Sequence, residues 1–120
     1  MSAVTAACLV TRRALFLESG GLDARHLPVN FSDIDYCLRL RAAGWRVVMT
    51  PHARLYHHES VSRRPAEGAL RRRRAAREAA WMRRRWHAAM LSDPYYHPNF
   101  GPFRADFTLG RLVRRPSTPE

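Results

Sequence analysis

The chain has 120 residues, of which 46% are hydrophobic, so it can form one modest core and is too apolar to be disordered throughout. Its formal net charge is +11, with arginine as the basic residue throughout, which favours anionic partners such as nucleic acid, phosphorylated sugars or lipid headgroups. No apolar run has the length that crosses a bilayer, and the first residues lack the order of a secretory signal, so we expect no membrane span.

The first predicted elements are a strand and a short helix. Residues 3–10, AVTAACLV, form an apolar, partly β-branched run without helical periodicity, which predicts a buried strand. A short helix is expected over residues 12–19. Gly20 and Gly21 should end it, because glycine adopts the left-handed conformation that closes helices. A loop is expected from there to residue 31.

A second helix is predicted to begin at Ser32. Ser32 suits the N-cap position, and Asp35 lies three residues later, where the acidic partner of a capping box would stand. Gly44 should end this helix. The side chains expected on its inward face are Ile34, Cys37, Leu38 and the stem of Arg41.

Two extended segments are expected next. Residues 45–49, WRVVM, predict a strand that Pro51 ends. Residues 53–60 are expected to be extended as well. If they are pleated, Leu55 and His57 lie on one side and Tyr56 and His58 on the other.

The third helix is predicted over residues 66–91. It is rich in arginine and alanine, including RRRR at 71–74 and RRR at 83–85. Its expected apolar positions are Leu70, Trp81, Met82, Trp86 and Met90. The chain then divides into residues 1–65, this helix, and a proline- and aromatic-rich loop and tail over 92–120.

Three interpretations of the arginine-rich helix are open. The arginines can bind nucleic acid, which would make binding steeply salt-dependent. They can lie against anionic lipid, with Trp81 and Trp86 at the interface. They can also be a solvated cationic face with both tryptophans packed on the fold, which we favour. We expect no specific nucleic acid, because the chain has neither zinc-ligand spacing nor a recognisable nucleic-acid module.

The two cysteines indicate a reducing compartment. Cys8 and Cys37 both lie in apolar runs, so they are expected to be buried thiols and not a disulfide framework. Cytoplasm is the compartment that this favours.

Acidic, histidine and arginine side chains near the predicted element ends suggest a site for a phosphorylated substrate. Asp33 lies in the favourable field of a helix N-terminus, which suits a general base. His57 can offer an imidazole to a divalent metal or to a diphosphate oxygen. On the residues alone, a surface capping role for Asp33 and an ordinary strand position for His57 remain open. The arginines that can add charge to the same anion are Arg39, Arg41 and Arg54.

The order of these motifs resembles a known family. TAACLVTRRALFLESGGLD, then NFSDIDYCLRLRAAGWRVVMTPHARLYHHESVSRR, then DPYYHPNF are similar to the C-terminal half of family 2 glycosyltransferases of bacterial polysaccharide and rhamnan synthesis. The resemblance runs from Val4 to Phe107. It implies a GT-A fold of the α/β class and a hexosyltransferase that moves a sugar, with inversion, from a nucleotide-diphospho-sugar to a saccharide or lipid-linked saccharide acceptor. It also implies a cytoplasmic enzyme at the inner face of the cell membrane.

The resemblance also assigns roles to residues. Asp33 falls on the catalytic aspartate that removes the acceptor proton. Gly20, Gly21 and Asp23 fall on a GG-x-D loop that shapes the acceptor side of the cleft. His57 falls on a histidine that approaches the diphosphate or the metal. Asp35 matches the second acid of the same stretch, for which the capping role is a sufficient reason.

One part of the family pattern is not in this sequence. The donor-binding strands and the DxD motif that holds the divalent metal, Mn or Mg, are expected upstream. We therefore expect a fragment that is inactive by itself, with an exposed sheet edge, an unfinished core and a tendency to aggregate. The alternative function is a small basic nucleic-acid-binding protein or an inactive remnant.

Overall fold

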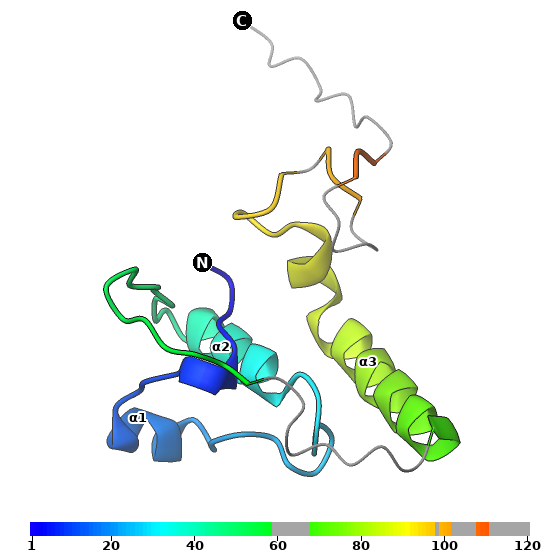
Figure 1. Ribbon diagram of the computed structural model, residues 1–120, viewed down its shortest axis with the longest axis horizontal. Coiled ribbons are helices and arrows are strands. Elements are labelled where there is room, and N and C mark those ends of the chain that lie inside the picture. The colour runs from blue at the N-terminus through cyan, green and yellow to red at the C-terminus, as the bar shows by residue number, and fades with distance from the viewer. Residues whose placement is uncertain (59–67, 98, 102–107, 111–120) are drawn as a thin grey trace, which may run out of the picture.

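The computed structural model describes residues 1–58, 68–97, 99–101 and 108–110 (Figure 1). Within these ranges the elements are a 3₁₀ turn, η1 at Ala6–Cys8, and three α-helices, α1 at Arg13–Glu18, α2 at Ser32–Ala42 and α3 at Gly68–Leu91. Figure 1 shows α3 running beside the group formed by η1, α1 and α2. The predicted helices are therefore confirmed where they are described.

A small apolar core joins α2 to α3. Leu27 from the loop, Leu38 from α2 and Met82 from α3 are buried together. Partly buried side chains that pack against them are Phe31, Ile34, Trp81, Trp86 and Ala89. Removing these surfaces from water supplies the main favourable free energy for docking α3.

Glycines end both of the first two α-helices, as predicted. Gly20 and Gly21 have φ of +79° and +63°, and the Gly21 N–H donates to the Phe16 carbonyl at 2.8 Å. Gly44 has φ of +85° after α2, where the Trp45 N–H donates back to Leu40 at 2.9 Å. These left-handed turns satisfy carbonyls that the helix ends would leave unpaired.

The start of α2 differs from the prediction. Phe31, not Ser32, is the N-cap residue, and it adopts a left-handed conformation with φ of +66°. The preceding Asn30 is held by α3, since its backbone N–H and side-chain amide both donate to Glu78 Oε2, at 2.8 and 2.7 Å. Because this anchor fixes the chain before the helix, Ser32 becomes the first helical residue. The capping-box role expected for Asp35 is also wrong, because Asp35 is fully buried.

Both predicted strands are wrong for the described residues. Residues 3–10 contain η1, and the Ala6 N–H, which a sheet would pair, donates to the Asp33 side chain instead. Residues 45–49 form no regular element, and Val48 and Met49 are 75% and 70% exposed. A strand needs a neighbouring strand, and no ladder forms in this part of the chain. The GT-A fold implied by the resemblance includes strands that are expected upstream of this sequence, and it stays a prediction.

The remaining predictions concern the cysteines, membrane spans and domain boundaries. Cys37 is buried as expected, whereas Cys8 is exposed. Among the described helices, none is both long and apolar enough to span a bilayer. The boundary between residues 65 and 66, and residues 98, 102–107 and 111–120 of the expected loop and tail, lie outside the described residues.

Candidate functional site

The Asp33 carboxylate lies at the first turn of α2 and is held by two backbone amides. Its Oδ1 accepts the Ile34 N–H at 2.9 Å, and its Oδ2 accepts the Ala6 N–H of η1 at 2.8 Å. The side chain is half-buried. Since each carboxylate oxygen has two lone pairs, both oxygens keep one site for a further donor. Asp33 is therefore fixed in position and still able to accept a proton.

Asp23, in the loop after α1, forms a close pair with His26. Asp23 Oδ1 accepts the His26 backbone N–H at 3.0 Å, and Oδ2 lies 2.9 Å from the imidazole Nδ1. Partial burial acts to raise the pKa of Asp23, but the hydrogen bonds from His26 and its nearby charge outweigh this and lower it. His26 was not among the predicted site residues, although the D-x-x-H spacing of Asp23 and His26 is a signal for such a local pair.

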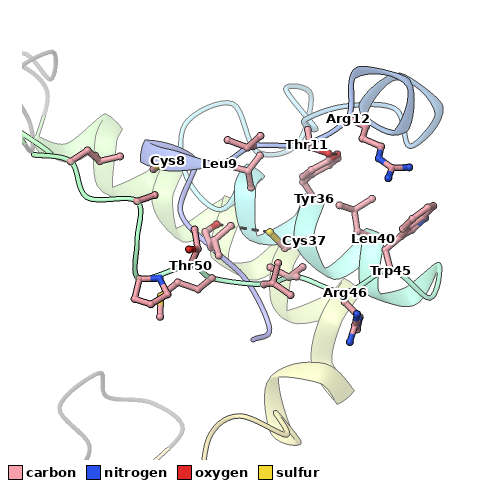
Figure 2. A pocket seen from close by; sticks show the side chains of 18 of the residues that line it. Cys8, Leu9, Thr11, Arg12, Tyr36, Cys37, Leu40, Trp45, Arg46 and Thr50 are labelled. Carbon is pink, nitrogen blue, oxygen red and sulfur yellow. Dashed lines mark hydrogen bonds between the residues drawn. The ribbon is translucent and has the colours of Figure 1, made fainter.

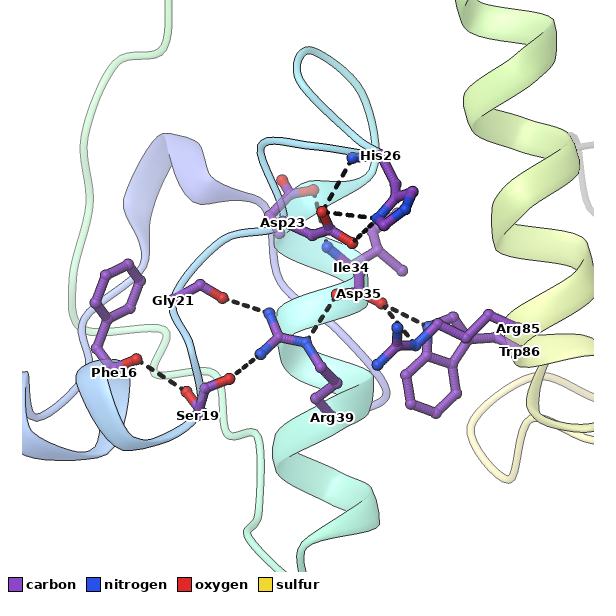
Figure 3. A network of polar contacts seen from close by, with 11 residues as sticks. Phe16, Ser19, Gly21, Asp23, His26, Ile34, Asp35, Arg39, Arg85 and Trp86 are labelled. Carbon is purple, nitrogen blue, oxygen red and sulfur yellow. Dashed lines mark hydrogen bonds and ion pairs between the residues drawn. The ribbon is translucent and has the colours of Figure 1, made fainter.

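Asp35 is the centre of the polar network that connects the helices. Its Oδ2 accepts Arg39 Nε–H at 2.8 Å, and its Oδ1 accepts the Trp86 indole N–H at 2.8 Å (Figure 3). Arg85 Nε lies 3.5 Å from Oδ1. Asp35 therefore ties α2 to α3, and its buried charge is compensated by two arginines.

Arg39 extends this network to the glycine loop. Its two terminal nitrogens donate to the carbonyls of Ser19 and Gly21, as Figure 3 shows. Three of the five guanidinium N–H groups of Arg39 are thus used within the fold. The expected role of Arg39 in binding a substrate anion stays a prediction. Through Arg39, the buried Asp35 fixes the loop that carries Gly20, Gly21 and Asp23 against α2.

The other two arginines of the predicted anion site lie in different surroundings. The Arg41 guanidinium lies 5.5 Å from the centre of the Tyr95 ring. Arg54 is exposed at the edge of a cavity. The structure therefore does not bring Arg39, Arg41 and Arg54 together at one described anion site.

His57 is exposed on the segment that follows residue 51. In the part of the chain that the structure describes, no three His, Cys, Asp or Glu side chains come together as a metal site. The assignment of His57 to a metal or diphosphate stays a prediction.

A cavity of about 1170 Å³ lies between the N-terminal segment, α2 and residues 45–56 (Figure 2). Its lining is mainly aliphatic and aromatic, with a polar contact of 2.9 Å between the Thr11 and Tyr36 hydroxyls. Val10 and Tyr56 also line it and are 95% and 94% exposed. The lining matches an uncovered apolar core better than a sugar site, which needs convergent polar groups.

Cys37 lies at the inner wall of this cavity. Its thiol faces the Val4 carbonyl at 3.9 Å. Burial raises the pKa of the thiol against the opposing effect of that contact, and the negative charge of Asp33 raises it further. Cys37 is therefore a protonated structural side chain and not a nucleophile.

The tryptophans of α3 face the fold. Trp86 donates to Asp35, and the Trp81 ring stacks on the His26 ring with centroids 5.0 Å apart. Arg85 lies over Trp81, 4.9 Å from its ring centre. The expected packing of both tryptophans on the fold is confirmed, and it leaves neither ring at a lipid interface.

Comparison with known proteins finds partial similarity to much longer chains. The protein is 52% identical over 108 residues to the uncharacterized protein y4gI of Sinorhizobium fredii, covering 90% of this chain and 12% of the relative. It is 42% identical over 108 residues to the O-antigen biosynthesis protein RfbC of Myxococcus xanthus, covering 90% of this chain and 8% of the relative.

A third relative is matched over a shorter stretch. The chain is 38% identical over 65 residues to the N-acetylglucosaminyl-diphospho-decaprenol L-rhamnosyltransferase of Mycobacterium tuberculosis, covering 52% of this chain and 21% of the relative. No family model and no solved structure matches. The chain thus spans about a tenth to a fifth of the length of these relatives.

Proposed function

We propose that the chain is the acceptor-side part of a glycosyltransferase of cell-surface polysaccharide synthesis, with Asp33 as its general base. The names of two relatives, an O-antigen biosynthesis protein and a rhamnosyltransferase, support a glycosyltransferase role at the family level. The observation that carries the proposal is the Asp33 carboxylate, held at the start of α2 by the amides of Ala6 and Ile34.

The proposed reaction is an inverting transfer from a nucleotide-diphospho-sugar. The acceptor hydroxyl donates a hydrogen bond to a free lone pair of Asp33, and its oxygen attacks the anomeric carbon. The bond from that carbon to the diphosphate oxygen breaks, the nucleoside diphosphate leaves with the electron pair, and Asp33 takes the proton. A bound Mn or Mg ion would stabilise the leaving diphosphate.

The acceptor is proposed to bind between Asp33 and the loop of Gly20, Gly21 and Asp23. The hydrogen bonds from Arg39 to the Ser19 and Gly21 carbonyls support this, because they fix the loop to α2, the helix that carries the proposed base. Asp23, with its lowered pKa, is ionised and can accept hydrogen bonds from sugar hydroxyls. The third relative's name includes a diphospho-decaprenol acceptor, which favours a lipid-linked saccharide.

The test uses the native gene product that contains this chain. Its mass is measured first, and it is then assayed with a panel of nucleotide-diphospho-sugars and lipid-linked acceptors. Asp33→Asn should lower kcat by roughly 10²- to 10⁴-fold, the usual contribution of a general base. Donor affinity should change little, because the base does not contact the donor diphosphate.

A matched control separates catalysis from folding. Glu18→Gln removes one carboxylate charge at an exposed position of α1 and should leave kcat unchanged. The melting temperature of the Asp33→Asn protein should stay close to that of the parent, since the asparagine oxygen keeps one backbone amide paired. Unchanged turnover in a folded Asp33→Asn protein would rule out Asp33 as the base.

A further inference from the structure

The outward side of α3 carries a row of arginines. Arg73, Arg77 and Arg84 follow one another at spacings of four and seven residues, which places them on one side of the helix. Arg72 and Arg83 each precede one of these arginines and are rotated from it by about 100° around the helix axis. All five are exposed. At a rise of about 1.5 Å per residue, the row covers about 18 Å of the helix. α3 therefore presents a continuous cationic face to solvent.

The opposite side of α3 faces the protein. Glu78 and Met82 are buried there, and Trp81 and Trp86 contact the loop and α2. Glu78 is the one acidic residue in the helix sequence, so the outward side has no negative charge of its own. The cationic face thus lacks local compensation within α3.

Exposed apolar side chains lie near both ends of α3, at Leu70 in the first turn and at Leu91 beyond the bend at Trp86. Leu70 is 62% exposed in the first turn, and Leu91 is 60% exposed in the last turn. Leu70 and Met90 were predicted as apolar positions of the helix, but Leu70 is not buried, and Glu78, which accepts the Asn30 N–H, lies two turns after it. Met90 is also 48% exposed, after the bend at Trp86.

We propose that this face binds a bilayer surface that carries anionic phospholipid headgroups. Arg73, Arg77 and Arg84 contact lipid phosphates, and Leu70 and Leu91 enter the headgroup region at either end. The anchors are thus the leucines, not the tryptophans that the sequence suggested. Binding needs no sugar transfer, so this proposal and the proposed function fail independently.

Two observations favour lipid over nucleic acid. Trp81 and Trp86 are turned inward, so the cationic face offers no aromatic platform on which bases can stack. The α3 sequence also contains no Asn, Gln, Ser or Thr, which with arginine are the side chains that read base edges. A lipid surface requires only positive charge and apolar contact.

The test is flotation of the full 120-residue chain with vesicles through a density gradient, in which aggregated protein stays at the bottom. Phosphatidylcholine vesicles are compared with vesicles that also contain phosphatidylglycerol, each across a salt series. We expect binding to the anionic vesicles alone and a decline in binding with salt. Equal binding to both vesicle types, or binding to neither, would overturn the proposal.

A matched pair of variants locates the binding face. Arg73, Arg77 and Arg84 are changed to Glu in one protein, and the exposed Arg13, Arg25 and Arg46 in the control. Each set lowers the formal net charge by 3 × 2, from +11 to +5. The α3 variant should bind anionic vesicles about a hundredfold more weakly than the parent, since each removed arginine contributes roughly a factor of five.

The control should lose much less affinity, and equal losses in both variants would mean that net charge alone drives binding.

If circular dichroism shows that the Glu variant has lost helix, the same three positions are changed to Gln, which preserves helix propensity. Unchanged binding of that variant would contradict the proposal. Saturable, stoichiometric binding of a single-stranded RNA oligonucleotide at a salt concentration that abolishes vesicle binding, lost when the same three arginines are changed, would assign the face to nucleic acid instead.

Discussion

The Asp35 carboxylate accepts the indole N–H of Trp86 at 2.8 Å, although the two residues are 51 positions apart in the sequence. The same carboxylate accepts Arg39 Nε–H at 2.8 Å within α2. One buried carboxylate thus connects α2 to α3. Through Arg39, which also donates to the Ser19 and Gly21 carbonyls, it connects both helices to the loop after α1. Asp35 is thus used within the fold, whereas Asp33, two residues earlier, accepts two backbone N–H groups and keeps a lone pair on each oxygen.

Replacing Asp35 with Asn should strongly destabilise the protein. The substitution leaves the guanidinium of Arg39 without its buried carboxylate partner, and breaking such a pair costs about 3–5 kcal/mol. The free energy of unfolding in urea measures the loss. Glu18→Gln, exposed on α1, should change it by less than about 0.5 kcal/mol. A loss below about 1 kcal/mol for Asp35→Asn would show that the network contributes little.

Gly20 and Gly21 should differ in their tolerance of alanine. Both have positive φ, so alanine costs roughly 1–2 kcal/mol at either position. A Cβ at Gly20 would meet nothing within 4 Å, but at Gly21 it would lie 3.0 Å from the Phe16 ring. Gly21→Ala should therefore lower the free energy of unfolding by more than Gly20→Ala. Equal losses would mean that Phe16 moves aside freely.

Local signals in the sequence predicted the helices well. Gly20, Gly21 and Gly44 end helices because only their own backbone conformation is involved, and this depends on residue type. Asp33 was likewise placed at the start of α2 by the sequence pattern. Its partner Ala6 lies 27 residues away, and no short-range rule predicts that hydrogen bond.

The errors come from long-range contacts. Asp35 follows Ser32 at capping-box spacing, but the capping role failed because Trp86 and Arg39 supply better donors inside the core. The runs at 3–10 and 45–49 have strand composition, yet composition does not supply the neighbouring strand that a ladder needs. Cys8 was expected to be buried with the first of these runs and is exposed for the same reason.

The two cysteines should differ in reactivity toward a thiol reagent such as Ellman's reagent. Cys8 is exposed, whereas Cys37 is buried and the pKa of its thiol is raised by burial above the ordinary value of 9.0. Below that pH the folded chain should therefore label quickly at Cys8 and slowly at Cys37. Cys8→Ser should remove the fast phase, and denaturant should make Cys37 react quickly.

The pH dependence of the slow phase follows from the same shift. Because the pKa of Cys37 is higher in the folded chain than in the unfolded chain, the folded state binds the thiol proton more tightly. This contribution to stability is fully present below the unfolded pKa and is lost as pH rises through the folded pKa. Labelling of Cys37 should therefore speed up at alkaline pH together with a fall in the free energy of unfolding. Fast labelling of Cys37 at neutral pH in a folded Cys8→Ser protein would show that the inner wall of the cavity is open to solvent.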